Sequence, residues 1–184
     1  MKKYYLSKII CLLLLVGVHF SCTSDLDFNQ VNDLKLEPVY ELNFSYFNVP
    51  ATAFVASDGT NYQWAYDDEE FDVFRDKYIN SYLQRADFYF EITNTIARAF
   101  SLNIVLLDAN NNMLTTIIMD VPAYSGTANT ISQTEIFQNA RLELLKSTRK
   151  MRFMVAMKPG AVLDENSPGN LILRSSATVY MDIQ

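Results

Sequence analysis

Histidine and cysteine are nearly absent from this chain of 184 residues, which has one histidine and two cysteines. His19 and Cys11 lie within the first 21 residues, so the rest of the chain holds no histidine and one cysteine, Cys22. Ser-His-Asp and Cys-His catalysis needs an imidazole that moves a proton near neutral pH, and zinc sites are built mainly from Cys and His. Beyond residue 21 the composition therefore excludes both kinds of site, and it excludes an internal disulfide.

Glycine and basic residues are also scarce. The five glycines are isolated, so the chain has no Gly-rich loop for phosphates. Three of the 15 Lys and Arg lie in residues 1–21, which leaves 12 basic against 21 acidic side chains, a net charge of −9. Such a surface repels nucleic acid and anionic lipid head groups. We expect no nucleic-acid partner and no cofactor.

No apolar run is long enough to span a bilayer, which takes about 20 residues. The longest, at residues 9–18, has about ten residues and follows Lys2, Lys3 and Lys8. A positive start, a short apolar core and a small residue, Ser21, are typical of a secretory signal peptide. We expect residues 1–21 to be removed, and the remaining 163 residues suffice for one domain with its own core.

Ser21 and Cys22 at the end of this leader resemble the lipobox of bacterial lipoproteins. His19 and Phe20 depart from it, because lipoboxes usually carry Leu and a small residue at these two positions. The resemblance implies that Cys22 carries a diacylglycerol on its sulfur and, after cleavage, a further acyl chain such as palmitate on its amino group. Two or three acyl chains hold a protein durably on a bilayer. The alternative is an ordinary leader cut nearby, with Cys22 a free thiol.

The residues after Cys22 favour a tether at the cell envelope. Thr23 is not the Asp that retains enterobacterial lipoproteins in the inner membrane, and residues 23–27 partly resemble the acidic tract of surface lipoproteins in Bacteroidota. We therefore expect a lipid anchor in the outer membrane, with exposure at the cell surface or toward the periplasm left open. Residues 22–38, polar and without clear periodicity, are the expected tether, and residues 39–184 the domain.

A period of two residues dominates that domain and predicts β-strands. Tyr40, Leu42, Phe44 and Tyr46 alternate with polar residues and are expected to share one buried face. Further strands are predicted at residues 86–94, 101–107, 113–119, 131–137 (an edge strand), 151–157 and 171–183, with all but the edge strand supplying most of the core.

The other segments give less regular patterns. Residues 54–56 are expected to continue the first strand after Pro50, and residues 67–82 fit either a helix or a short strand, of which we favour the strand. Residues 108–112 predict a hairpin turn, because Asn tolerates the left-handed backbone of tight turns. With one short helix at most, at residues 140–146, the sequence predicts an all-β protein: an antiparallel sandwich of seven or eight strands in the immunoglobulin-like style.

The sequence also resembles an uncharacterised group of small lipoproteins from Flavobacteria and their relatives. The resemblance covers most of the chain beyond the leader. It implies the same cellular location and the same fold, but it implies no activity and no functional residues. It rests on the Ser-Cys leader end and on residues 25–28, 88–95, 106–108 and 165–169.

Tyr62, Trp64 and Tyr66 alternate along an extended segment, so their rings are predicted to share one face. Such a platform stacks on sugar rings or packs against a partner protein. The alternative is that Trp64 plugs one end of the sandwich.

Acidic residues cluster just beyond these rings, at Asp67, Asp68, Glu69, Glu70 and Asp72. Hard cations bind several oxygen ligands, so Asp67, Asp68, Glu70 and Asp72 are weak candidates for calcium, and paired carboxylates serve glycosidases. A run of adjacent acids is more often a solvated loop or strand edge.

Asp108, Asn110 and Asn112 have the first three ligand spacings of an EF-hand loop. Met113 stands where that loop needs Gly, and Met119 where it needs Glu. The hairpin turn is therefore the favoured interpretation.

Together these features predict a membrane-anchored lipoprotein that is not an enzyme and acts as a binding or envelope-assembly module. The expected partners are the membrane, through the lipid anchor, and an unidentified protein or glycan. One alternative is a carbohydrate-binding surface module that uses the three aromatic residues. Another is a hydrolase that uses carboxylates alone.

Overall fold

The computed structural model describes residues 35–71 and 73–183 of the chain. The predicted signal peptide and Cys22 lie outside these residues, so lipidation stays a prediction. The compact unit that carries the fold spans Leu36–Ile183. Among the residues described, no helix has the length and apolar character needed to cross a membrane.

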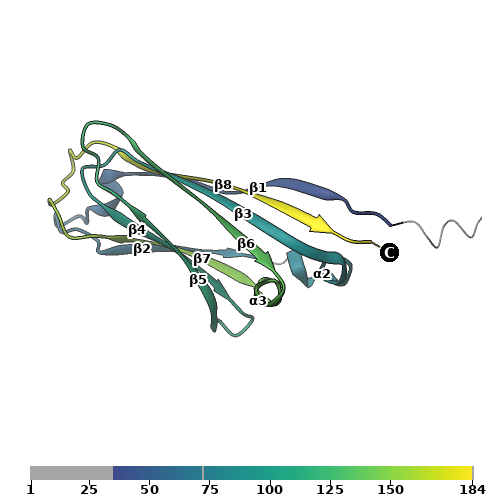
Figure 1. Ribbon diagram of the computed structural model, residues 1–184. Coiled ribbons are helices and arrows are strands. Elements are labelled where there is room, and N and C mark those ends of the chain that lie inside the picture. Colours follow the sequence, from purple (N-terminus) through teal and green to yellow (C-terminus); the bar gives the residue numbers. More distant parts are fainter. Residues whose placement is uncertain (1–34, 72, 184) are drawn as a thin grey trace, which may run out of the picture. The chain divides into compact units, whose positions relative to one another are not determined.

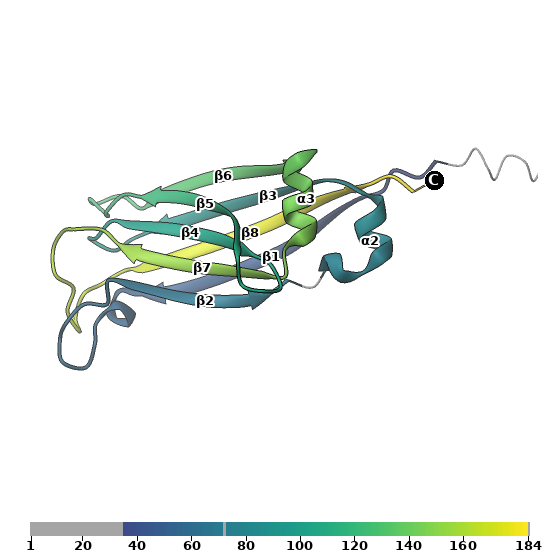
Figure 2. The ribbon, with the colours of Figure 1, turned by 90° about the horizontal axis from the view of Figure 1, so that it is seen from below.

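Within the described residues, eight strands form two four-stranded antiparallel sheets that face each other (Figures 1 and 2). One sheet has the order β1-β8-β3-β6, and the other has the order β2-β7-β4-β5. The all-β antiparallel sandwich predicted from the sequence is confirmed. The strands are β1 (Val39–Pro50), β2 (Trp64–Glu70), β3 (Leu83–Asn94), β4 (Phe100–Leu107), β5 (Met113–Val121), β6 (Asn129–Gln138), β7 (Lys150–Met157) and β8 (Asn170–Met181).

The strand order is that of a jelly roll. Strand β1 pairs with β8, β2 with β7, β3 with β6 and β4 with β5, as if one long hairpin were wound around a barrel. This nested pairing defines the eight-stranded jelly roll. The immunoglobulin-like style named from the sequence is therefore replaced by a more specific order, which strand periodicity alone does not specify.

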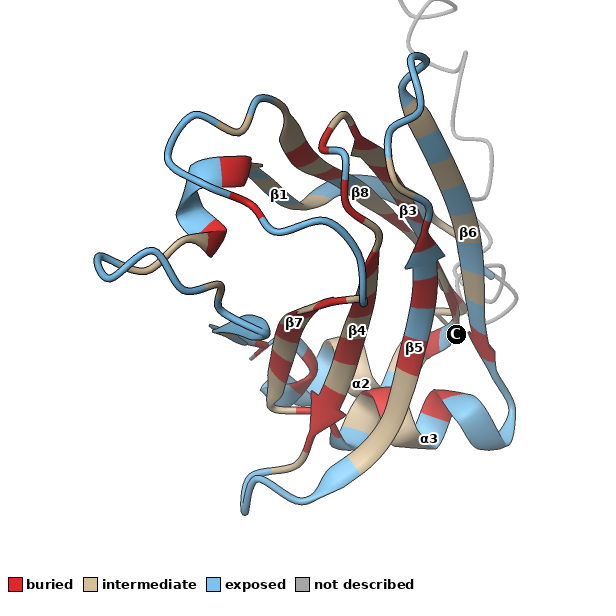
Figure 3. Cartoon of the chain, turned by 90° about the vertical axis from the view of Figure 1, so that its left-hand side faces the viewer, coloured by how far each residue is buried: buried red, intermediate tan, exposed pale blue. Residues whose placement is uncertain are grey.

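The core lies between the sheets and follows the predicted alternation. Buried and more exposed residues alternate along strands such as β5 and β7 (Figure 3). Burial of these apolar side chains is the main force that holds the sheets together. The fully buried large side chains include Phe54, Phe88, Phe90, Phe100, Phe137, Leu83, Ile92, Ile96, Leu102, Ile104, Leu106 and Met119. The segments predicted to supply most of the core do so.

Strand β1 departs from the predicted pattern at a β-bulge. Asn43 pairs with Ser176 and Tyr46 with Arg174, so two residues of β1 oppose one of β8. The extra residue sends the Tyr46 side chain to the other side of the sheet. Phe44 packs into the core, whereas Tyr40, Leu42 and Tyr46 are 49%, 52% and 63% exposed, so the prediction that all four share one buried face is wrong.

Residues 54–56 were expected to continue the sheet after Pro50, but Phe54 ends the 3-10 helix η2 (Ala51–Phe54) and Val55 forms an isolated bridge. Pro50 ends the ladder because proline has no N–H to donate. The Phe54 ring lies 4.9 Å from that of Phe100, centroid to centroid, which ties the helix to the core.

Residues 67–82 also differ from the favoured strand. The strand β2 ends at Glu70, and the 3-10 helix η3 (Val73–Arg75) and the α-helix α2 (Lys77–Tyr82) follow. Helix α2 begins where it does because the Asp76 carboxylate accepts hydrogen bonds from the backbone N–H groups of Tyr78 (2.8 Å) and Ile79 (3.1 Å).

Three other local predictions are confirmed. Helix α3 (Ala140–Ser147) forms where a short helix was expected. Residues 108–112 turn between β4 and β5, with Asn111 at a φ of 60°. Strand β6 lies at the edge of its sheet.

The sandwich has a helical end and a loop end. Val39 pairs with Tyr180 at one end of β1, and Pro50 pairs with Asn170 at the other. The Val39 end also holds α2, which leads into Leu83, and α3, which joins β6 to β7 (Figure 2). The connections 51–63, 95–99, 122–128 and 158–169 gather at the opposite end.

Candidate functional site

The outer surface of the sheet β2-β7-β4-β5 carries two of the aromatic residues singled out in the sequence. Met151, Phe153, Val155 and Met157 of β7 are buried, so the residues between them point outward. Residues directly opposite in a ladder lie on the same side of the sheet. Trp64 opposite Ala156, Tyr66 opposite Met154 and Asp68 opposite Arg152 therefore face outward.

Trp64 and Tyr66 form an exposed ring pair. Their ring centroids lie 5.6 Å apart with an interplanar angle of 25°, a stacked arrangement. The side chains are 57% and 54% exposed, so Trp64 does not plug an end of the sandwich. Large aromatic surfaces that stay exposed on a sheet are suited to packing against a ring or another protein.

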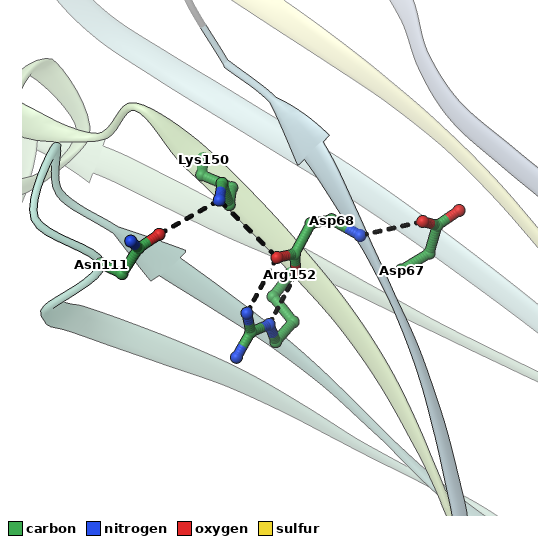
Figure 4. A network of polar contacts seen from close by, with 5 residues as sticks. All are labelled: Asp67, Asp68, Asn111, Lys150 and Arg152. Atoms are coloured by element: carbon green, nitrogen blue, oxygen red, sulfur yellow. Dashed lines mark hydrogen bonds and ion pairs between the residues drawn. The ribbon is translucent and has the colours of Figure 1, made fainter.

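Arg152 of β7 packs against the Tyr66 ring of this pair. Its guanidinium carbon lies 4.9 Å from the centre of the Tyr66 ring. Two hydrogen bonds, of 2.6 and 2.8 Å, join the guanidinium to the two carboxylate oxygens of Asp68 (Figure 4). Such a bidentate pair holds the guanidinium in one orientation. The Lys150 ammonium lies 3.7 Å from the same carboxylate and donates to the Asn111 side chain at 3.1 Å.

This ion pair shifts the protonation of both partners. The hydrogen bonds from Arg152 lower the pKa of Asp68 below its usual value, with a smaller contribution from Lys150. The same bonds raise the pKa of Arg152. The carboxylate and guanidinium therefore stay charged over the whole physiological range.

The same outer surface continues across the sheet as a row of residues. Met154 of β7 lies opposite both Tyr66 and Asn103, and Asn103 lies opposite Ile118, which is 58% exposed. The row thus runs from one edge strand to the other. We call this surface the aromatic face and define it by Trp64, Tyr66, Arg152, Met154, Asn103 and Ile118.

Tyr62 does not join the ring pair. Its backbone N–H donates to the Phe54 carbonyl oxygen at 2.9 Å, in the connection before β2. The side chain is 52% exposed, and within the described part of the chain it makes no ring contact. The structure thus assembles two of the three predicted aromatic residues.

The acidic run is divided by the pleat of β2. Asp68 and Glu70 lie opposite Arg152 and Lys150 on the outer side. Asp67 and Glu69 line a groove of about 210 Å³ between the edge strands β1 and β2, above apolar side chains that include Phe47 and Val155.

Asp72 lies outside the described residues. Over residues 35–71 and 73–183, no three acidic, His or Cys side chains come together as metal ligands.

The Asp108 carboxylate is engaged within its own hairpin turn. It accepts hydrogen bonds from the backbone N–H groups of Asn110 (2.7 Å) and Asn112 (2.8 Å) and from the Asn112 side chain (3.0 Å). These bonds lower the pKa of Asp108, with the Asn112 side chain as the largest cause. The carboxylate stabilises the turn, as the hairpin interpretation requires.

The outer surface of the other sheet has a Tyr–Arg–Asp cluster of its own, in which Arg85 lies 5.2 Å from the centre of the Tyr180 ring and makes two hydrogen bonds of 2.7 Å to the Asp87 carboxylate. The rows of this surface place Ser176 beside Tyr89 and Thr134, and Ile172 beside Thr93 and Thr130. The Thr93 and Thr130 hydroxyl oxygens lie 3.0 Å apart. Among the residues described, the stacked and exposed aromatic pair lies on the outer surface of the β2-β7-β4-β5 sheet and not on that of the other sheet.

No family model and no curated protein matches the chain. Solved structures resemble it weakly. A protein of Parabacteroides distasonis described as secreted is 14% identical with a TM-score of 0.43, over 62% of this chain and 36% of its own. The VP2 subviral particle of infectious bursal disease virus is 10% identical with a TM-score of 0.42, over 78% and 32%. The chain spans about a third of their lengths, and similarity at this level says nothing of function.

Sequence analysis did not identify Arg152, Met154, Asn103 and Ile118 as members of the site. They lie on β7, β4 and β5, and only the pairing register brings them beside Tyr66. Of these four residues, only Arg152 could have been singled out in the sequence, because it is a basic residue within an otherwise apolar strand.

Proposed function

We propose that the protein is an exported, lipid-anchored module of the cell envelope that binds a partner through its aromatic face and is not an enzyme. The anchor is Cys22, and the membrane is the outer membrane. The stacked and exposed pair of Trp64 and Tyr66 carries the proposal. The partner is a flat surface that covers the face.

The chemistry of the face favours binding over catalysis. Trp64, Tyr66 and Ile118 supply apolar area, and Arg152 supplies hydrogen-bond donors whose position Asp68 fixes. Aromatic residues and arginine dominate the energetics of protein interfaces. The charges beside the rings are already neutralised by each other, so the face binds through contact area rather than through a reactive group.

The acidic residues support the same conclusion. A pair of catalytic carboxylates must converge on one cleft at a set separation. Asp67 and Asp68 lie on opposite sides of β2, and the Asp68 carboxylate is held by Arg152. This arrangement disfavours the hydrolase alternative.

Photo-crosslinking in cells that make the native protein tests this proposal. A photoreactive amino acid at Ile118 is expected to yield discrete adducts of higher mass, because this position lies on the aromatic face. The matched control is Thr178, which lies on the outer surface of the other sheet. Equal adducts from both positions, or none from Ile118, would contradict the proposal.

Carbohydrate is a second candidate for the partner, and the exposed ring pair favours it specifically. Sugar rings present flat apolar C–H surfaces that stack on Trp and Tyr. On a glycan array, the chain from Cys22 onward is expected to bind defined glycans, and Trp64→Ala is expected to abolish that binding. Tyr89→Ala, on the other sheet, is the control that should retain it. Binding that persists in Trp64→Ala removes carbohydrate as the partner of this face.

A further inference from the structure

The helical end of the sandwich carries a concentration of exposed apolar side chains. Sixteen large apolar or aromatic side chains are exposed in the described part of the chain, and eight of them lie at this end. Ile136 of β6 is 37% exposed, and the exposed fractions of the other seven run from 48% to 69%. We call these seven the collar: Leu36, Val39, Tyr40, Leu42, Val73, Tyr78 and Met113.

The register places the collar residues at one end although they come from distant segments. Leu36 forms a bridge with Ile183, and Tyr40 and Leu42 lie opposite Val179 and Ala177 of β8. Tyr78 belongs to α2, and its ring stacks edge to face on Tyr82 with 4.7 Å between centroids.

The other sheet contributes the two remaining collar residues. Met113 follows the turn that joins β4 to β5, and its partner Leu107 lies opposite Lys150, the first residue of β7. Val73 follows β2 at the same end, because Glu70 also pairs with Lys150.

The geometry points to a lipid bilayer as the surface that covers the collar, an inference that rests on the proposed anchor at Cys22. The chain enters the sandwich at Leu36, which is itself a collar residue. Residues 23–35 separate Leu36 from Cys22, and 13 residues reach at most about 45 Å. An anchor at Cys22 is therefore connected to the sandwich at its helical end, which lies nearer the attachment point than the loop end does.

The composition of the collar suits the interfacial layer of a bilayer. Tyrosine concentrates there because its ring is apolar and its hydroxyl remains hydrated, and the aliphatic residues add buried area. Charges of both signs lie close by in the chain, at Lys35, Glu37, Asp76 and Lys77. Such a mixed set does not form the basic cluster that attracts anionic head groups, so zwitterionic lipids suffice for the contact.

Contact of the collar with lipid would orient the whole module. The sheets then stand away from the bilayer, with the loop end outermost. The aromatic face lies on the side of the sandwich and stays accessible to a partner. A second, weak membrane contact also adds to the acyl chains, as lipid anchors commonly require two signals.

Quenching by brominated lipid tests this contact. The chain from Cys22 onward has one cysteine, so the Cys22 thiol can be coupled to maleimide lipid in vesicles of phosphatidylcholine and phosphatidylethanolamine. Trp64→Phe removes the only tryptophan, and Tyr40→Trp then places a single reporter in the collar. Its emission is expected to fall strongly when the acyl chains are brominated. Val162→Trp, at the loop end and 77% exposed, is the control whose emission should not change.

The outcomes distinguish this contact from its rivals. Unchanged emission at position 40, or equal quenching at positions 40 and 162, would overturn the inference. Tyr78→Trp is a second reporter that serves if Tyr40→Trp does not fold. A spectral shift without vesicles that grows with protein concentration would instead assign the collar to a second copy of the chain. In this test Cys22 is coupled to lipid chemically and not by the cell. The collar can therefore fail to contact lipid although cells lipidate Cys22, and it can contact lipid although cells do not.

Discussion

Phe44 and Tyr46 lie two residues apart on β1 and yet point to opposite sides of the sheet. The β-bulge between Asn43 and Tyr46 causes the difference. The Phe44 ring meets the Phe88 ring edge to face with 5.1 Å between centroids, whereas Tyr46 is 63% exposed. The bulge is held by Ser175, whose hydroxyl accepts from the Ser45 N–H and donates to the Ser45 carbonyl oxygen, both at 2.8 Å.

Truncation of these two side chains should therefore have unequal effects. Phe44→Ala is expected to lower the free energy of unfolding by about 2 to 3 kcal/mol, because it leaves a cavity among four aromatic rings. Tyr46→Ala is the matched control and should cost no more than about 0.5 kcal/mol. Urea unfolding of the chain from Cys22 onward measures both. Equal losses of unfolding free energy in the two variants would mean that Phe44 and Tyr46 are equally buried, and would contradict a bulge between Asn43 and Tyr46.

Gly169 is predicted to be intolerant of a side chain. Its φ is 101°, and a Cβ there would overlap the carbonyl group of Thr95. Gly169→Ala should cost more than about 2 kcal/mol, because left-handed strain and a clash with backbone act together. Gly126 has a φ of 103° but open space around it. Gly126→Ala should show the strain alone, about 1 kcal/mol. Thermal unfolding compares the two, and similar losses would count against the packing of residues 95 and 169.

Asn94 is fully buried at the loop end and is expected to hold its connections together. Its side-chain N–H groups donate to the carbonyl oxygens of Arg98 (2.8 Å) and Pro122 (2.7 Å), and its oxygen accepts from the Ile96 N–H (2.9 Å). Asn94→Ala leaves the Arg98 carbonyl oxygen and the Ile96 N–H unpaired, while the Pro122 carbonyl oxygen keeps a long hydrogen bond of 3.4 Å from Asn129, and the substitution should cost about 3 kcal/mol. Asn103→Ala, on the aromatic face, should cost far less. A small loss in Asn94→Ala would mean that water satisfies these groups.

The Asp68–Arg152 pair predicts a pH dependence. Arg152 lowers the pKa of Asp68 in the folded protein, so the pair adds stability above the ordinary aspartate pKa, and this stability is lost as pH falls through the lowered pKa. Asp68→Asn should therefore be less stable than the native chain at about pH 7, with the difference shrinking toward about pH 3. Urea midpoints across this range measure it. In an Arg152→Gln background, Asp68→Asn should have little further effect. An undiminished effect there would assign the lowered pKa to another group.

The sequence revealed the strands but not the way in which they pair. Alternation located β3, β4 and β7 because they bury every second residue along most of their length, and it located β5 and β8 because part of each strand does so. Alternation does not say which strand lies beside which, so the nested order of the jelly roll was not predictable from it. The bulge in β1 was also hidden, because it depends on the Ser175 hydroxyl, 130 residues from Ser45.

The candidate site shows the same limit. The spacing of Trp64 and Tyr66 placed both rings on one side of an extended segment, and the structure agrees. Arg152 completes the site only through the pairing of β2 with β7. The cap of α2 was visible in principle, since Asp76 stands just before the helix. The spacing of Phe71, Phe74 and Tyr78 is helical, but Phe71 and Val73 also fitted a short strand.

The anchor at Cys22 is the central claim, because the orientation of the module and its address both depend on it. Mass spectrometry of the native protein, extracted from envelope membranes with detergent, tests it directly. The account predicts an amino-terminal peptide that begins at Cys22 and carries a diacylglycerol on sulfur, and Cys22→Ser should abolish the modification. A mature protein that begins at another residue, or an unmodified thiol at Cys22, would contradict it.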